Sequence, residues 1–249
     1  MEKMTHISLA ENRDCMEAMR AMPDKWADLA IVDPPYGIGE SGDKNHTRGK
    51  RAGFDNNKWT KRIPAKKFKG FSGADKEPMP IEFFAELRRV SKNQIVWGAN
   101  HFISRLPYDS PAWIVWDKMN GESDFADCEL AWTSFKCAVR KFQYKWNGML
   151  QQDMANKEVR IHPTQKPVSL YKWLLTNYAK PGDKILDTHL GSGSSRIAAL
   201  DMGFDFWGYE LDKDYFDAQE ARFAAHRAKP ALFAPQEMYR FEQSAIPFE

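Results

Sequence analysis

The chain has 249 residues, enough to bury a substantial core, and we expect one α/β domain with insertions. Its three cysteines, Cys15, Cys128 and Cys137, lack paired spacing, so neither a disulfide framework nor a zinc cluster is indicated and a reducing cytoplasm is expected. The formal net charge is only +2, and no apolar run approaches the roughly 20 residues of a membrane span, which favours a soluble intracellular protein.

Strands and helices are predicted to alternate along the chain. Helical periodicity covers residues 14–22, and the continuously apolar residues 27–32 are typical of a buried parallel strand. After a long polar insertion, residues 37–80, helical spacing resumes over 81–90, behind Pro80. We further expect strands over 94–97, 113–116 and 129–135, a helix over 167–179, a strand over 184–187, a helix over 196–202, a strand over 206–209 and a helix over 215–227. Short connections between such elements predict a mainly parallel sheet with helices on both faces.

The most informative motif, Asp33-Pro34-Pro35-Tyr36, ends the strand over 27–32. Two prolines fix φ and remove both backbone donors, so the strand must stop and its last carbonyl groups are free for a ligand. The Asp33 carboxylate and the Pro34 carbonyl could accept both hydrogens of an exocyclic amine, while Tyr36 stacks on the flat ring that bears it. A strand-ending turn with a surface tyrosine is the structural alternative.

A second candidate site is the glycine-rich turn at 187–195, between the strand over 184–187 and the next helix. Gly191 and Gly193 let the backbone approach a ligand, and the start of the helix offers free N–H groups. About 20 residues downstream the next strand ends at Glu210, where such folds place an acid on ribose hydroxyls. The pattern indicates a nucleotide-type pocket.

Positive charge is concentrated directly after the Asp33 turn. Residues 40–77 carry a net charge of +6 and the rest of the chain −4. The cations there include Lys44, Arg48, Lys50, Arg51, Lys58, Lys61, Arg62, Lys66, Lys67 and Lys69, interleaved with Phe54, Trp59, Phe68 and Phe71. A second basic stretch has Lys136, Arg140, Lys141 and Lys145, together with Phe142, Tyr144 and Trp146. Both patterns suit phosphate contact with base or sugar stacking, and a solvated charged face is the alternative.

These motifs together resemble the S-adenosylmethionine-dependent DNA amino-methyltransferases. Asp33-Pro34-Pro35-Tyr36 resembles the catalytic motif of that family, and its position before the glycine turn resembles the permuted β group. The residues that match the cofactor segments are Asp14 and Cys15, His162, Thr164 and Lys166, Asp187, Gly191, Ser192 and Gly193, and Glu210, with Asp33 between the two ligands. The chain departs from the family at His189, usually an aromatic residue, and at Ser194 and Ser195, usually threonines. We interpret His189 as part of the pocket wall.

The resemblance implies a Rossmann-like methyltransferase fold with a mostly parallel seven-stranded sheet. Residues 1–230 would form a single catalytic domain, with a basic DNA-contacting insertion at about 40–80 and a carboxyl-terminal tail over 231–249. S-adenosylmethionine is the implied methyl donor, without a metal, and double-stranded DNA the implied partner. Resembling enzymes are often homodimers.

The expected reaction is methyl transfer to the N6 amine of a flipped-out adenine. The cytosine N4 amine is the nearest alternative, although a serine in place of Asp33 would be more usual there. A non-catalytic DNA-binding protein that keeps the fold is the alternative from another class. Carbon methylation of cytosine is disfavoured, because no cysteine in the chain follows a proline. The sequence indicates neither a recognition site nor a companion restriction endonuclease.

Overall fold

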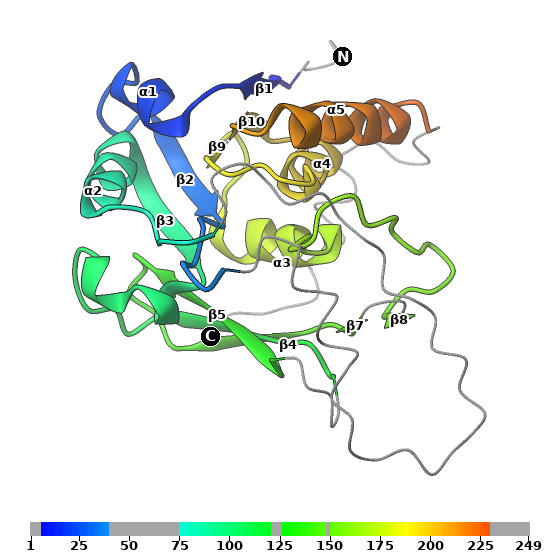
Figure 1. Ribbon diagram of the computed structural model, residues 1–249, viewed down its shortest axis with the longest axis horizontal. Coiled ribbons are helices and arrows are strands. Elements are labelled where there is room, and N and C mark those ends of the chain that lie inside the picture. The colour runs from blue at the N-terminus through cyan, green and yellow to red at the C-terminus, as the bar shows by residue number, and fades with distance from the viewer. Residues whose placement is uncertain (1–5, 40–74, 121–125, 148–149, 230–249) are drawn as a thin grey trace.

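The computed structural model describes residues 6–39, 75–120, 126–147 and 150–229 (Figure 1). Its centre is an eight-stranded sheet in the order β1-β10-β9-β2-β3-β5-β4-β6. The parallel part comprises β1 (Ser8–Asn12), β10 (Asp205–Glu210), β9 (Lys184–Asp187), β2 (Ala27–Val32) and β3 (Ser91–Trp97). The other part comprises β5 (Cys128–Thr133), antiparallel to both its neighbours, with β4 (Trp113–Asp117) and β6 (Arg140–Gln143); β7 (Trp146–Asn147) and β8 (Leu150–Gln151) pair separately.

The expected α/β class with a mostly parallel sheet is confirmed, but the strand count differs. The main sheet of the described residues has eight strands rather than seven, since residues 140–143, interpreted from the sequence as a basic stretch, pair with β4 as the edge strand β6. Strand β1, which the sequence analysis did not anticipate, pairs with β10 at the opposite edge. Its five residues, Ser-Leu-Ala-Glu-Asn, include only two adjacent apolar ones, so the sequence carries no clear strand pattern there.

Helices cover both faces of the sheet (Figure 1). α1 (Cys15–Arg20) and α2 (Ile81–Val90) lie on one face, while α3 (Val168–Tyr178) and α4 (Ser194–Met202) lie on the other, with α5 (Lys213–Arg227) beside α4, β1 and β10. Two short 3-10 helices, η2 (Ala99–His101) and η3 (Ile103–Arg105), follow β3. No helix in the described ranges is long and apolar enough to cross a bilayer.

Burial on both faces explains the continuous apolar run of β2. Leu29 and Ile31 pack in the core cluster that contains α3 and α4, whereas Ala30 and Val32 pack in the cluster that contains α1 and α2. All four side chains are at most 1% exposed. A strand buried in this way cannot alternate polar with apolar residues, so β2 is fixed in the middle of the sheet.

The order of the strands reverses between β9 and β2. The chain moves from β9 through α4 to β10 in one direction, and from β2 through α2 to β3 in the other. Because crossovers diverge at this point, a crevice opens at the carboxyl ends of the two strands, which is where open α/β sheets bind ligands. The Asp33 turn follows β2 and the glycine turn follows β9, so both motifs lie at this switch point.

Candidate active site

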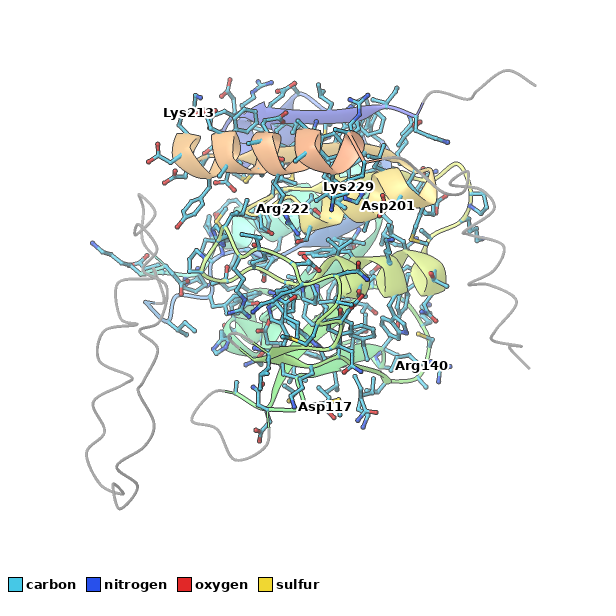
Figure 2. All side chains as sticks on the ribbon, turned by 90° about the vertical axis from the view of Figure 1, so that its right-hand side faces the viewer. Asp117, Arg140, Asp201, Lys213, Arg222 and Lys229 are labelled. Atoms are coloured by element: carbon cyan, nitrogen blue, oxygen red, sulfur yellow. The ribbon has the colours of Figure 1, made fainter. Side chains whose placement is uncertain are left out.

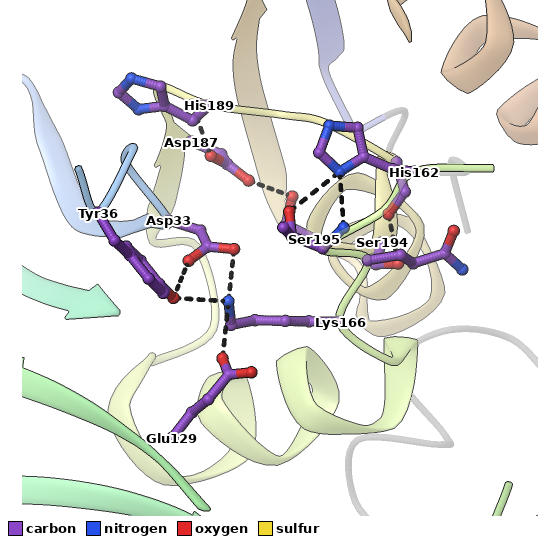
Figure 3. Close-up of polar contacts among 12 residues, drawn as sticks. Asp33, Tyr36, Glu129, His162, Lys166, Asp187, His189, Ser194 and Ser195 are labelled. Carbon is purple, nitrogen blue, oxygen red and sulfur yellow. Dashed lines mark hydrogen bonds and ion pairs between the residues drawn. The ribbon is translucent and has the colours of Figure 1, made fainter. Parts of the chain in front are cut away.

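The Asp33 carboxylate is held from two sides (Figure 3). The Tyr36 hydroxyl donates to Asp33 Oδ1 at 2.6 Å, and Lys166 Nζ donates to Asp33 Oδ2 at 2.5 Å. Lys166 Nζ is also 3.1 Å from the Tyr36 hydroxyl oxygen. The side chain of Lys166 is 2% exposed and that of Asp33 15%. Burial raises the pKa of Asp33, and the Lys166 ammonium opposes that rise.

Lys166 also belongs to a chain of alternating charges. Its Nζ lies 3.1 Å from Glu129 Oε2 on β5, and Glu129 Oε1 forms an ion pair with Lys118. Burial acts to raise the pKa of Glu129, but the two lysines outweigh it and lower the pKa to about 2. Rings of Trp97 and Tyr36 lie 5.5 and 5.6 Å from Lys166 Nζ. Lys166, which the resemblance assigns to the cofactor pocket, thus has its ammonium on Asp33.

Tyr36 is fixed by its neighbours. Gly98, directly after β3, has φ of +69°, and a Cβ atom there would lie 2.0 Å from Tyr36 Cε1. The His101 ring stacks on the Tyr36 ring with centroids 5.2 Å apart and planes 16° apart. Pro34 is buried, and no described residue donates a hydrogen bond to its carbonyl oxygen. The turn therefore presents a carboxylate, an open carbonyl group and an aromatic ring together.

The two ends of the basic insertion meet beside Tyr36. Asp75 Oδ1 accepts a hydrogen bond from Gly37 N at 2.5 Å, and its carbonyl oxygen accepts one from Gly39 N at 2.5 Å. Tyr36 itself forms a β-bridge with Pro78. The described residues that flank 40–74 in sequence thus lie together next to the turn Asp33–Tyr36.

The glycine turn is organised by two carboxylates. Asp187 accepts from Ser195 Oγ at 2.5 Å and from His189 N at 3.0 Å, while Glu210 Oε2 accepts from Gly191 N at 2.8 Å. Burial raises the pKa of Asp187 to about 7 and also raises that of Glu210. These hydrogen bonds fix the conformation of the turn in front of the α4 amino terminus.

Further contacts come from α5 and from the segment before α3. Arg222 donates to the Ser192 carbonyl oxygen at 2.7 Å and to Glu158 Oε2 at 2.6 Å, which ties α5 to the turn. The His162 ring would lie 3.7 Å from a Cβ atom at Gly191, and Thr164 Oγ1 is 3.1 Å from His162 Nδ1. The His162 ring therefore lies beside the glycine turn, and Thr164 contacts His162. Burial lowers the pKa of His162 to about 4, so its ring is neutral at pH 7.

His189 packs as a wall residue. Its ring meets Phe83 edge-on, with centroids 5.3 Å apart, and its Nδ1 lies 2.9 Å from Thr188 Oγ1. Burial lowers its pKa to about 4. In this site a neutral imidazole occupies the place where the family usually has an aromatic ring.

The segment with Asp14 and Cys15 also reaches this end of the sheet. The Asp14 side chain caps α1 by accepting from Met16 N at 2.8 Å and from Glu17 N at 3.0 Å, which is a structural role. Arg13 N donates to the Glu210 carbonyl oxygen at 3.1 Å, which places the segment next to the end of β10. Burial raises the pKa of Cys15 to about 12, so it is a thiol.

The predicted nucleic-acid contacts are only partly covered by the described residues. All those between Lys44 and Lys69 lie outside the described residues. Arg140 and Lys141 are exposed on β6, at the sheet edge farthest from α5 and several strands from β2 (Figure 2). Trp146, one of the aromatic residues expected to stack on bases or sugars, is instead 4% exposed in the core, and the Phe142 and Tyr144 rings stack on each other. The Trp146 ring is therefore too buried to stack on a base.

Sequence reasoning missed several residues of the site, Lys118, Glu129 and Gly98 among them. Glu129 did carry a signal, because it is the one charged residue of the otherwise mostly apolar strand Cys128–Thr133. Gly98 carried none, since its role depends on the position of Tyr36, far away in sequence. Arg222 and Glu158 likewise come together only in three dimensions.

Comparisons with known proteins find similarity to DNA methylases. A family model described as DNA methylase matches residues 104–221. The chain is 25% identical over 254 residues to the type II methyltransferase M.HinfI of Haemophilus influenzae, covering 87% of this chain and 68% of that one. It is 26% identical over 218 residues to the putative methylase YubD of Escherichia coli K12, covering 85% and 88%.

Solved structures share the fold. TTHA0409, a putative DNA modification methylase from Thermus thermophilus complexed with S-adenosyl-L-methionine, matches with a TM-score of 0.53 and 18% identity over 91% of this chain and 98% of that one. The PvuII DNA methyltransferase, cytosine-N4-specific, matches with a TM-score of 0.52 and 11% identity over 95% and 93%. The methyltransferase fold expected from the sequence is thereby confirmed.

Gly98→Ala should displace Tyr36. The new Cβ atom would collide with the ring, so we expect the free energy of unfolding to fall by about 2 kcal/mol or more in urea titrations. Gly182→Ala is the matched control, because Gly182 also has a positive φ, +90°, but a Cβ atom there meets nothing within 4 Å. Equal losses in the two variants would show that the contact with Tyr36 is unimportant.

Proposed function

The chain belongs to the DNA amino-methyltransferase family, and from that premise we propose that it transfers a methyl group from S-adenosylmethionine to the N6 amine of adenine in double-stranded DNA. One observation carries the proposal. The Asp33 carboxylate, the Pro34 carbonyl group and the Tyr36 ring stand together at the strand end next to the glycine turn. Acceptors for two amine hydrogens thus lie beside a nucleotide-type pocket.

The residues around the glycine turn fit the proposed cofactor. The α4 amino terminus provides backbone N–H groups behind Gly193, whose φ of +71° few other residues adopt. Glu210 ends the neighbouring strand, and each of its oxygens accepts one backbone hydrogen bond in the structure. A carboxylate oxygen has two lone pairs, so both can still accept from ribose hydroxyls. When bound, S-adenosylmethionine supplies an electrophilic methyl group on its sulfonium.

The protein would act by orienting a weak nucleophile. The amine of adenine is poorly nucleophilic because its lone pair is delocalised into the ring. Hydrogen bonds to Asp33 and to the Pro34 carbonyl favour a pyramidal nitrogen and aim its lone pair, while stacking on Tyr36 fixes the ring. Positioning and fixed charges therefore supply the rate. Asp33 does not remove a proton beforehand, since a neutral aromatic amine is too weak an acid; the proton leaves after transfer.

Adenine is favoured over cytosine by the residue at the strand end. An aspartate stands at position 33, where a serine is more usual in the cytosine-directed relatives. The fold does not distinguish the two bases, because a cytosine-N4-specific enzyme shares it. A paired adenine would have to leave the duplex, at a cost of a few kcal/mol, to reach Tyr36.

Asp33→Ala should abolish methyl transfer. We expect a loss of about 100-fold or more in kcat, because the variant lacks the acceptor for the amine. Nucleosides from DNA incubated with methyl-deuterated donor can be identified by mass spectrometry, and cofactor affinity by calorimetry should survive. Asp109→Ala, at an exposed carboxylate outside the site, is the control. Undiminished turnover of Asp33→Ala, or N4-methylcytosine as the wild-type product, would contradict the proposal.

Cofactor affinity should depend on pH through Asp187. Its pKa of about 7 means that binding a cation must compete with its proton, so affinity for S-adenosylmethionine should rise between about pH 6 and pH 8 with proton release. S-adenosylhomocysteine lacks the sulfonium charge and should show a smaller rise. Calorimetry at several pH values in two buffers measures both effects. The same pH dependence for both ligands would argue against an ionised Asp187 near the sulfonium.

The basic insertion should set the salt dependence of DNA binding. Charge reversal of Lys66, Lys67 and Lys69 should weaken binding and reduce the slope of log K against log salt by about 2 to 3, if each lysine meets one phosphate. Reversal of the exposed Lys180, Lys213 and Lys229 gives the same change in net charge elsewhere. Fluorescence anisotropy measures both slopes. An equal slope in the two triple variants would show that the insertion is only a solvated charged face.

A further inference from the structure

Lys166 contacts the Asp33 carboxylate, which a target amine would use as a hydrogen-bond acceptor. Its ammonium has three N–H groups and three oxygen contacts, at 2.5 Å to Asp33 Oδ2, 3.1 Å to the Tyr36 hydroxyl and 3.1 Å to Glu129 Oε2. The other Asp33 oxygen accepts from Tyr36. Without a base in the site, both oxygens of the catalytic carboxylate are therefore engaged, one of them by a full positive charge.

A neutral amine is a weak competitor for that carboxylate. The amine is uncharged, so its hydrogen bond to the Asp33 carboxylate lacks the full Coulomb attraction between that carboxylate and the ammonium. Each Asp33 oxygen keeps a second lone pair, but the amine gains the undivided negative charge only when the contact between Lys166 and Asp33 loosens. The ammonium cannot retreat into water, because its side chain is 2% exposed and lies against Trp97 and Tyr36.

Glu129 offers the alternative position for that charge. Its Oε2 atom is buried and, although 3.1 Å from Lys166 Nζ, has no aligned hydrogen bond among the described residues. Its other oxygen is taken by Lys118. One acceptor of Glu129 is thus underused and faces the ammonium that has to give way.

We propose that Glu129 is a positioning residue for methyl transfer, which receives the Lys166 ammonium when the amine of the target base takes its place on Asp33. The proposal rests on the proposed function of Asp33. Lys166 remains buried and paired in both arrangements, so one ammonium shifts between two carboxylates as the base enters. No covalent step is involved.

The charged and titratable groups around the pair define how it responds to pH. Around Asp33 lie Lys166, Tyr36, Glu129 and, across the switch point, Asp187. Around Glu129 lie Lys166, Lys118 and Arg160. Tyr171 lies near Asp33 and Glu129. The negative charge of Glu129 acts to raise the pKa of Asp33. Removing the negative charge of Glu129 should lower the pKa of Asp33. The acid limb of a plot of kcat against pH should then move to lower pH.

Glu129→Gln is the primary test. The neutral amide keeps the shape but cannot hold the ammonium, so Lys166 stays on Asp33 and we expect kcat to fall about 10-fold or more while calorimetry finds the same affinity for S-adenosylmethionine. The acid limb should shift to lower pH. Glu129→Asp, which keeps the charge, should recover part of the loss. A merely structural role would leave the acid limb where it is.

A double-mutant cycle tests whether Glu129 acts through Lys166. In a Lys166→Met background no ammonium has to move, so Glu129→Gln should have no further effect on kcat. Independent, multiplicative losses would overturn the proposal. Glu86→Gln is the matched control, because Glu86 is similarly exposed, 24% against 22%, and pairs with Arg89 away from the site.

The proposed function and the role of Glu129 can fail separately. If the wild type transfers no methyl group to DNA, the proposed function fails; if it does, and Glu129→Gln matches it in kcat and acid limb, only the present inference fails. Should thermal melts show that Glu129→Gln is unfolded, Lys118→Gln is the second variant. It leaves Glu129 without its competing lysine, so kcat should rise, and a fall would overturn the proposal.

Discussion

A buried carboxylate at the end of a central strand is the constraint on which the site depends. Asp33 can stay ionised away from water only because Lys166 neutralises it, and Lys166 is itself held by Glu129. Three distant parts of the chain must therefore meet at one point: the turn after β2, the segment before α3, and β5. The reversal of strand order at β9 and β2 places the glycine turn at the same point.

Such a network is poor evidence for stability. Moving ions out of water costs several kcal/mol each, and well-packed apolar residues often serve as well. Its presence at the mouth of the switch point is better explained by function, since perturbed ionisable groups cluster at active sites. The aromatic rings of Trp97 and Tyr36 beside the Lys166 ammonium exclude water and strengthen the interactions inside.

Local patterns in the sequence predicted much of this architecture. The bounds of β2 and β9 are those expected, because a doubly buried strand and a strand before a glycine turn have local signatures. The family resemblance, which puts Asp33 between the two ligands, implied that Asp33 lies close to the glycine turn. The ion pairs of Lys166 did not, since a lysine in a family motif gives no sign of which carboxylate it meets. Glu129 was a charged residue in an apolar strand, and only the strand order explains why it is there.

The most direct test is a crystal structure with S-adenosylhomocysteine and a DNA duplex that contains one candidate adenine. We expect the adenine outside the duplex, stacked on Tyr36, with its amine within hydrogen-bonding distance of Asp33 and the Pro34 carbonyl oxygen and about 3 to 3.5 Å from where the methyl group would be. Lys166 should then lie on Glu129. An adenine bound elsewhere, or a ligand at the glycine turn that cannot approach Asp33, would contradict the central claim.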